Sequence, residues 1–277
     1  MKELDVAAQK KIVLDILKYV HEICEKNNIR YFAGYGTALG AVRHQGFIPW
    51  DDDGDIEVPW PDYLKLMEII NSDESHYRFL SFGQKGYYYC YGKIIDTRTV
   101  VSTSARKVQI EGLGVDVDVF PLVGFDRKEE QQAFRKLQAM KMIGVNYAND
   151  AVRLRKNFLI YPVEKGLQLY YKKKGIEAWG RKLENMLNRY PFDRGEVVFS
   201  YGGLYKKRQL FDRHVYDSYE LMNFEDGKLR VCADWDGYLT HMYGDWRQLP
   251  DEDKRKAEHV SRAFWREDTE EDAGNDD

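Results

Sequence analysis

The hydrophobic and polar positions along the chain follow two periods, one typical of helices and one typical of strands. Residues 5–26 carry apolar side chains at helical spacing, with lysine and glutamate on the other face, and therefore predict an amphipathic helix. Four segments predict strands from their β-forming residues or their alternation: 29–33, 55–58, 87–95 and 114–120. Further helical patterns cover 37–42, 62–70, 128–142, 176–188 and 234–242.

The order of these elements predicts an α+β fold. We expect a mixed α+β core over residues 1–125, a helical insertion over 126–195, and a C-terminal segment over 196–266 that packs back on the core. Residues 267–277 are so acidic that we expect a solvated, disordered tail. With 277 residues, of which 43% are hydrophobic, the chain is long enough and apolar enough to bury such a core.

Charge and cysteine content narrow the class of protein. The formal net charge is −4, so no basic field favours nucleic acid as a partner. The three cysteines, Cys24, Cys90 and Cys232, are far apart, which fits neither a disulfide framework nor a zinc cluster and favours a reducing, cytoplasmic location. The N-terminus lacks the pattern of a signal peptide, and no apolar run approaches the ~20 residues of a membrane span.

An acidic run, Asp51-Asp52-Asp53-Gly54-Asp55, stands directly before a strand pattern. Carboxylates this close repel and raise one another's pKa unless a cation lies among them. Residues two apart on a strand point the same way, so Asp53 and Asp55 would project from one face and bracket a hard cation, Mg²⁺ or Mn²⁺. We expect a third oxygen ligand from the segment 115–121, where Asp116 and Asp118 share a face and either could serve.

Two plainer interpretations of the acidic run exist. Aspartates before a strand often form only a polar turn. A calcium loop is the other, because Asp51, Asp53 and Asp55 have its one-three-five spacing, but the glycine comes at the fourth position instead of the sixth. Upstream, the predicted turn 34–37 has glycines that let backbone N–H groups approach a ligand. Together with the distant strand carboxylate, this turn favours a site for a nucleotide phosphate and its metal.

The chain resembles the LicD-type phosphocholine transferases, whose relatives include fukutin and fukutin-related protein. The likeness spans residues 10–125 closely and 215–260 more loosely, and it lies in GTALGAVRH at 36–44, GFIPWDDD at 46–53, Asp55, KIID at 93–96, VDVFPL at 117–122, Tyr238-Leu239 and Tyr243-Gly244-Asp245. The resemblance implies a nucleotidyltransferase-like fold of the DNA polymerase β type for the catalytic core, and transfer of a phospho-alcohol from a CDP-linked donor to a glycan.

Carried across by position, the resemblance implies that Asp53, Asp55 and Asp118 bind the metal. Asp116 has no counterpart in the family's pattern, where that place is usually apolar. Gly54 stands where the family usually has Ile or Val. This change loosens the strand by up to ~1 kcal/mol but removes no ligand.

The reaction that we expect releases CMP from a donor such as CDP-choline and places phosphocholine on a lipopolysaccharide, a teichoic-acid precursor or another cell-surface glycan. The turn Gly34, Gly36 and Thr37 would donate to the diphosphate, while Arg43 and Lys93 would add positive charge against the leaving group. Either Asp51 or Asp118 would act as general base, and His44 would orient the loop. Candidates for a cage around choline are aromatic residues that could equally be core: Trp50, Trp60, Tyr88 and Tyr91.

Two alternative functions and one possible membrane-binding surface stay open. A DxD glycosyltransferase also holds a nucleotide diphosphate, but only about 50 residues precede this acidic run, too few for its usual nucleotide-binding half. A noncatalytic glycan- or nucleotide-binding protein is the third. The segment 152–174 mixes basic and apolar residues, so it could lie on the inner face of a membrane that presents a lipid-linked glycan acceptor. The simpler account is a helix that packs on the core by its apolar side.

Overall fold

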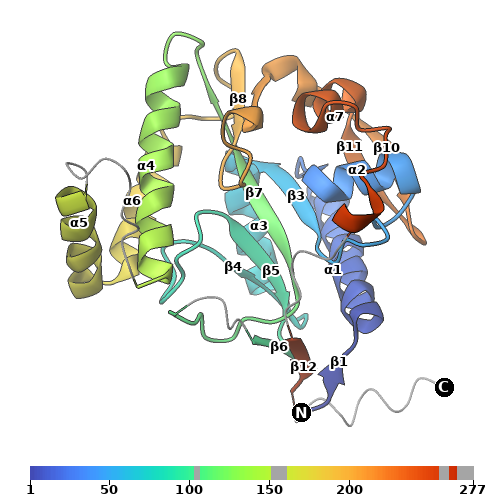
Figure 1. Ribbon diagram of the computed structural model, residues 1–277, viewed down its shortest axis with the longest axis horizontal. Helices are drawn as coiled ribbons and strands as arrows, with labels where there is room; N and C mark the ends of the chain where they lie inside the picture. The colour runs from blue at the N-terminus through green and yellow to red at the C-terminus, as the bar shows by residue number, and fades with distance from the viewer. Residues whose placement is uncertain (103–106, 151–160, 256–261, 267–277) are drawn as a thin grey trace.

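The computed structural model describes residues 1–102, 107–150, 161–255 and 262–266, and its centre is a curled mixed sheet (Figure 1). The strand order is β2 (Phe32–Ala33), β3 (Asp55–Pro59), β7 (Asp116–Phe125), β5 (Gly92–Asp96) and β4 (Tyr77–Leu80). The far half of β7 also pairs with β8 (Val197–Ser200), which pairs with β9 (Leu210–Asp212). Strands β3 and β7 are parallel, and the other pairs are antiparallel. The expected α+β class is thus confirmed.

Two helices cover the back of the sheet, α1 (Val6–Asn27) and α3 (Trp60–Ser72) (Figure 1). Their apolar faces meet strand residues that are completely buried, such as Ile56 and Val117. Gly54 explains how closely α1 approaches: a Cβ atom at this position would lie 2.8 Å from Val13 of α1 and 3.2 Å from Val117. The glycine therefore faces α1, and its neighbours Asp53 and Asp55 face the other side of the sheet.

Helix α2 (Tyr35–His44) packs with the C-terminal part of the chain at one end of that front face (Figure 1). It contacts α7 (Trp235–Tyr243) and the hairpin of β10 (Tyr219–Phe224) and β11 (Gly227–Cys232). Short 3₁₀ turns connect these elements: η1 (Lys206–Gln209), η2 (Arg213–Tyr216) and η3 (Glu252–Lys254).

Three helices of the described residues lie between β7 and β8 in sequence, on the opposite side of the molecule from α2 and α7 (Figure 1). They are α4 (Glu130–Ala148), α5 (Tyr161–Lys174) and α6 (Ile176–Leu187). A small third sheet joins the termini of the described chain through β1 (Glu3–Leu4), β12 (Arg262–Trp265) and β6 (Thr99–Ser102). Among the described residues, none of the helices combines the length and the apolar character that a membrane crossing requires.

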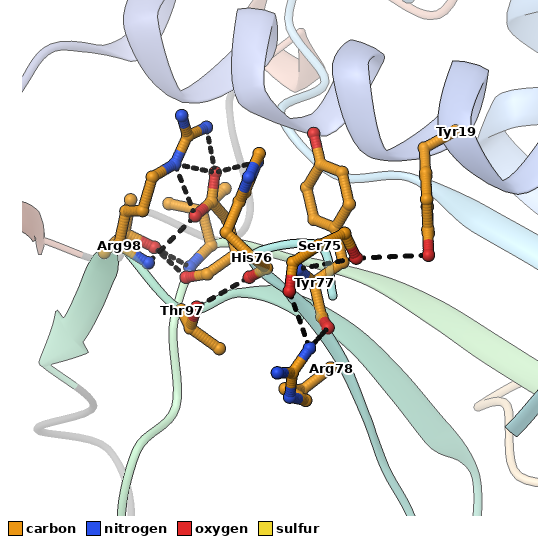
Figure 2. A network of polar contacts seen from close by, with 10 residues as sticks. Tyr19, Ser75, His76, Tyr77, Arg78, Thr97 and Arg98 are labelled. Carbon is orange, nitrogen blue, oxygen red and sulfur yellow. Dashed lines mark hydrogen bonds and ion pairs between the residues drawn. The ribbon is translucent and has the colours of Figure 1, made fainter. Parts of the chain in front are cut away.

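A polar network holds the ends of β4 and β5 together (Figure 2). The completely buried Asp96 accepts from the guanidinium of Arg98, with Arg98 Nη2 2.7 Å from Asp96 Oδ2. Thr97 Oγ1 donates to the carbonyl of His76 at 2.6 Å. Asp96 belongs to the KIID segment of the family resemblance, and its contacts give it a structural role at this end of the sheet.

The helical patterns are confirmed within a few residues at most boundaries, but the strand and turn predictions are less accurate. Residues 34–37 are not a turn, because α2 begins at Tyr35 and Gly34 is its N-cap. The strand predicted over 87–95 begins only at Gly92. Among the described residues, eight strands were not predicted: β1, β4, β6, β8, β9, β10, β11 and β12. The predicted tail 267–277 lies outside the described residues.

Candidate active site

Two aspartates meet on neighbouring parallel strands at the front of the sheet. Asp55 begins β3, and in the parallel register it stands opposite Asp118 of β7. The Asp118 N–H donates to the carbonyl of Gly54 at 2.8 Å, and the Asp55 N–H donates to Thr37 Oγ1 of α2 at 2.8 Å. Three elements that are far apart in sequence are thereby fixed around one pair of carboxyl groups.

The electrostatics of this cluster match the excess of negative charge that the sequence predicts. Burial raises the pKa of Asp55 well above its ordinary value, and the charges of Asp53, Asp118 and Asp51 raise it further. Burial likewise raises the pKa of Asp118 to about 7, although Lys93 opposes the shift. Burial also raises the pKa of Asp51. A cation among carboxyl groups with raised pKa values favours their ionised form.

Lys93 supplies one such cation. It lies on β5 opposite Asp118, and its Nζ is 2.5 Å from Asp118 Oδ1 and 2.6 Å from Asp116 Oδ1. Burial lowers the pKa of Lys93, but the two aspartates raise it more, so the net shift is well above the ordinary value. The ammonium therefore lies within the acidic cluster instead of extending to solvent. Asp116, which lacks a counterpart in the family pattern, has a clear structural task as the second anchor of Lys93.

The donor set suits a hard divalent cation, since it consists of buried carboxylates that raise one another's pKa. In the described part of the chain, however, no three acidic, histidine or cysteine side chains are arranged as ligands of one ion. The Lys93 ammonium lies against Asp118, one of the three residues to which the resemblance assigns the metal. The assignment of Asp53, Asp55 and Asp118 to a metal stays a prediction.

The start of α2 borders the cluster. The N–H of Gly34, a predicted donor, donates to the Asp55 carbonyl, and that of Tyr35 donates to the Tyr238 hydroxyl, both at 3.0 Å. Both amides therefore have partners within the protein. Gly36 lies against Asp51, because a Cβ atom there would be 2.5 Å from Asp51 Oδ2. The positive end of the α2 dipole thus faces acidic groups, which it stabilises in their charged form.

Arg43 and His44 lie at the other end of α2 from Thr37. Arg43 Nη1 donates to the carbonyl of Trp246 at 2.7 Å, and its Nε donates to His44 Nε2 at 2.9 Å. The His44 ring packs edge-on against Trp50, with 6.3 Å between centroids. These three predicted site residues therefore form a group of their own, which does not include the Asp55 and Asp118 pair.

The aromatic residues that the sequence suggested as a choline cage lie in different parts of the structure. Trp60 is wrong as a ligand contact, because it is 2% exposed and stacks on Phe82 in the core. Tyr88 and Tyr91 line a small open pocket, together with Tyr89 and with Lys141 of α4. Tyr89 was not singled out from the sequence.

This pocket adjoins the acidic cluster through Lys93. The Lys93 ammonium is 5.3 Å from the centroid of the Tyr89 ring and 5.7 Å from that of Tyr91. Those ring faces thus already attract a cation in the structure. The Tyr91 ring also packs on Phe120 of β7, two residues beyond Asp118, at 4.8 Å between centroids. Tyr89 and Tyr91 therefore line the pocket and also contact Lys93.

Comparison with known proteins agrees with the family resemblance of the sequence motifs. Residues 28–149 match the family model described as LicD/FKTN/FKRP, nucleotidyltransferase domain. The chain is 27% identical over 274 residues to the lipopolysaccharide cholinephosphotransferase LicD of Haemophilus influenzae, an alignment that covers 95% of this chain and 99% of that protein. The matched domain is of the nucleotidyltransferase class. The comparisons agree with the LicD-type resemblance of the sequence, because residues 28–149 match that family's domain and nearly the whole chain is similar to a LicD protein.

Two uncharacterized rickettsial proteins are also similar. The protein of Rickettsia prowazekii is 44% identical over 71 residues, which are 25% of this chain and 27% of that one. The protein of Rickettsia typhi is 29% identical over 204 residues, 72% of this chain and 53% of that one. The names of these two proteins state no activity, whereas the Haemophilus relative is named as a transferase.

Proposed function

We propose that this protein transfers phosphocholine from CDP-choline to a cell-surface glycan and releases CMP. The observation that carries the proposal is the pair of carboxyl groups of the buried Asp55 and the half-buried Asp118, on adjacent parallel strands of a chain similar to a lipopolysaccharide cholinephosphotransferase. Parallel strands that present acidic residues beside a helix N-terminus also support a nucleotidyltransferase-like core of the polymerase β type. The acceptor would be a lipopolysaccharide, with a teichoic-acid precursor as the alternative, and the reaction would take place in the cytoplasm.

Asp53, Asp55 and Asp118 would hold a divalent ion, Mg²⁺ or Mn²⁺, whose charge would neutralise that of the donor diphosphate. For this arrangement, Lys93 must release Asp118 Oδ1, which it contacts at 2.5 Å. Its ammonium would then pair with the oxygens of the leaving CMP while Asp116 keeps it near the site. The amides of Gly36 and Thr37, in the first turn of α2, would donate to the same diphosphate.

The transfer itself needs a base for the acceptor hydroxyl. That oxygen forms the new bond to the distal phosphorus, the bond from this phosphorus to the CMP oxygen breaks, and the hydroxyl proton goes to a carboxylate. Asp51 suits this role, because it borders Gly36 and because burial raises its pKa, which makes it a stronger base than an exposed aspartate. Asp118 is the alternative, although it would share the role with metal binding.

The choline moiety would bind in the tyrosine pocket. A quaternary ammonium has no hydrogen to donate and is held by aromatic faces, and Tyr89 and Tyr91 offer such faces next to Lys93 and the carboxylates. When Lys93 turns towards the diphosphate, the choline cation would take its place over the rings.

The test is a donor screen with the purified protein, Mg²⁺ and a lipopolysaccharide acceptor, following CMP release by chromatography. CDP-choline should be used in preference to CDP-ethanolamine, CDP-glycerol and CDP-ribitol, and chelation of the metal should stop the reaction. Transfer of a sugar from a UDP-sugar would instead support the glycosyltransferase alternative. CDP-choline binding without any CMP release, with acceptor and metal present, would indicate a noncatalytic binding protein.

A further inference from the structure

Helix α5 presents apolar side chains to solvent. Val163, Leu169 and Tyr170 are 62%, 55% and 52% exposed, although each is large and apolar. Pro162 and Gly166 are exposed on the same side, so these positions recur at helical spacing and form one stripe. Surface helices of globular proteins normally turn such a stripe towards the core.

The side of α5 that meets the rest of the protein is partly polar. Gln168 is 1% exposed; its Nε2 donates to the carbonyl of Asn146 in α4 at 3.2 Å, and its Oε1 accepts from Lys165 at 2.8 Å. Tyr171 is buried, and the half-buried Leu167 also packs against the core from this helix. The expectation that the segment packs on the core by its apolar side is therefore wrong for Val163, Leu169 and Tyr170.

Lysines extend the stripe at its C-terminal end. Lys172, Lys173 and Lys174 are all exposed, and Lys172 is paired with Asp150. Within the described ranges, Lys173 and Lys174 have no acidic partner. Helix α5 also lies at the outer edge of the molecule, beyond α4 and α6 and far from α2 and α7 (Figure 1). An apolar stripe that ends in lysines, on an outer edge, has the charge and polarity that an anionic bilayer surface complements.

We propose that α5 docks the protein on an anionic membrane surface. Val163, Leu169 and Tyr170 enter the boundary between headgroups and acyl chains, and Lys173 and Lys174 contact lipid phosphates. The helix lies in the plane of the membrane and does not cross it. This inference concerns binding alone, so its test needs neither donor nor acceptor, and it can fail while the proposed transferase activity holds.

The test is co-sedimentation of the full chain with vesicles of phosphatidylcholine, with and without about one third phosphatidylglycerol. The wild type should pellet with the anionic vesicles. Each lysine near such a surface contributes roughly fivefold to binding, so Lys173→Gln with Lys174→Gln should lower it by about thirtyfold. Leu169→Gln with Tyr170→Gln should lower it by about tenfold or more.

Matched controls separate α5 from general surface effects. Leu221→Gln with Leu249→Gln removes two apolar residues of similar exposure, 50% and 43%, and should leave binding unchanged. Lys85→Gln with Lys228→Gln makes the same change in net charge at other exposed positions and should have little effect. Because the changed side chains are exposed, all four variants should keep the wild-type circular dichroism and melting temperature.

Three results would overturn the proposal. The first is a wild type that stays in the supernatant with anionic vesicles. The second is pelleting of both α5 variants at the wild-type level. The third is a variant, Leu169→Gln with Tyr170→Gln, that binds vesicles like the wild type but changes its oligomeric state in sedimentation velocity. This result would mean that the stripe is a contact between copies of the chain.

Discussion

Replacing Lys93 with methionine tests what holds the acidic cluster together. Methionine keeps most of the apolar stem and removes the ammonium that contacts Asp116 Oδ1 at 2.6 Å and Asp118 Oδ1 at 2.5 Å. The side chains are only 11%, 17% and 20% exposed, so both carboxylates would lose a largely buried partner. Removal of one partner from a buried ion pair typically costs about 3–5 kcal/mol.

Because the two carboxylates are partly exposed to water, the expected loss is smaller than that range, about 2–3 kcal/mol. For a chain of this size, such a loss corresponds to a fall in the melting temperature of about 3–5 °C. The fall should be measured in the presence of a chelator, so that no divalent ion can replace the missing charge.

Addition of Mg²⁺ should then stabilise Lys93→Met more than the wild type. In the variant the ion replaces a lost counter-charge, whereas in the wild type it competes with Lys93 for Asp118. Lys141→Met is the matched control: Lys141 is half-buried, and its Nζ donates to the backbone carbonyls of Gly202 and Gly203 instead of a carboxylate. This control should lower the melting temperature without changing the effect of Mg²⁺.

The reasoning would be refuted by either of two results from calorimetry. An equal Mg²⁺-dependent shift in Lys93→Met and in the wild type would mean that Lys93 and the ion do not share a carboxylate. An unchanged melting temperature in the chelator would mean that Lys93 does not stabilise the cluster.

Three further predictions follow from the same contacts. Asp55→Asn should abolish CMP release, and retained release would contradict the site. The melting temperature at pH 7 should stay unchanged or rise, because burial and neighbouring aspartates raise the pKa of Asp55 and its ionised form therefore opposes folding. Tyr89→Leu should raise the KM for CDP-choline by about 3- to 30-fold, while Tyr89→Phe, which keeps the ring face, should leave the KM unchanged. Inhibition by CMP should be the same in both variants. Weaker CMP inhibition in Tyr89→Leu would place the cytosine base in the pocket instead. Gly54→Val should destabilise the protein by about 1–3 kcal/mol in urea unfolding, since a Cβ atom there meets Val13 at 2.8 Å, and equal stability would mean that α1 moves aside freely.

The parts of the structure that follow from local patterns could be predicted. Alternation of valine with aspartate was enough to turn Asp116 and Asp118 to one face, and helical spacing was enough to define α1 and α6. The short strands escaped prediction because pairing with distant residues, as between β8 and β7, creates them. Residues 34–37 were misassigned since their glycines suggest a turn, whereas contacts with Asp51 and Asp55 fix them in a helix start.

The candidate site was predictable in its carboxylates and less so in their partners. Nothing local to Lys93 shows that it pairs with two residues of β7, because the register of β5 against β7 brings them together. Tyr89 was missed for a similar reason: its position in the pocket depends on α4, which is distant in sequence. The outward stripe of α5 could not be predicted either, because periodicity defines a helical face without saying which way it points.

The most direct test of the central claim is a crystal structure of the protein with Mn²⁺ and CDP-choline, with the ion located by its anomalous signal. The account predicts one Mn²⁺ peak about 2.0–2.2 Å from carboxylate oxygens of Asp53, Asp55 and Asp118, in contact with the diphosphate, with Lys93 turned away from Asp118. A bound diphosphate with the Mn²⁺ elsewhere, or with Lys93 still paired to Asp118 and no ion between the carboxylates, would contradict it.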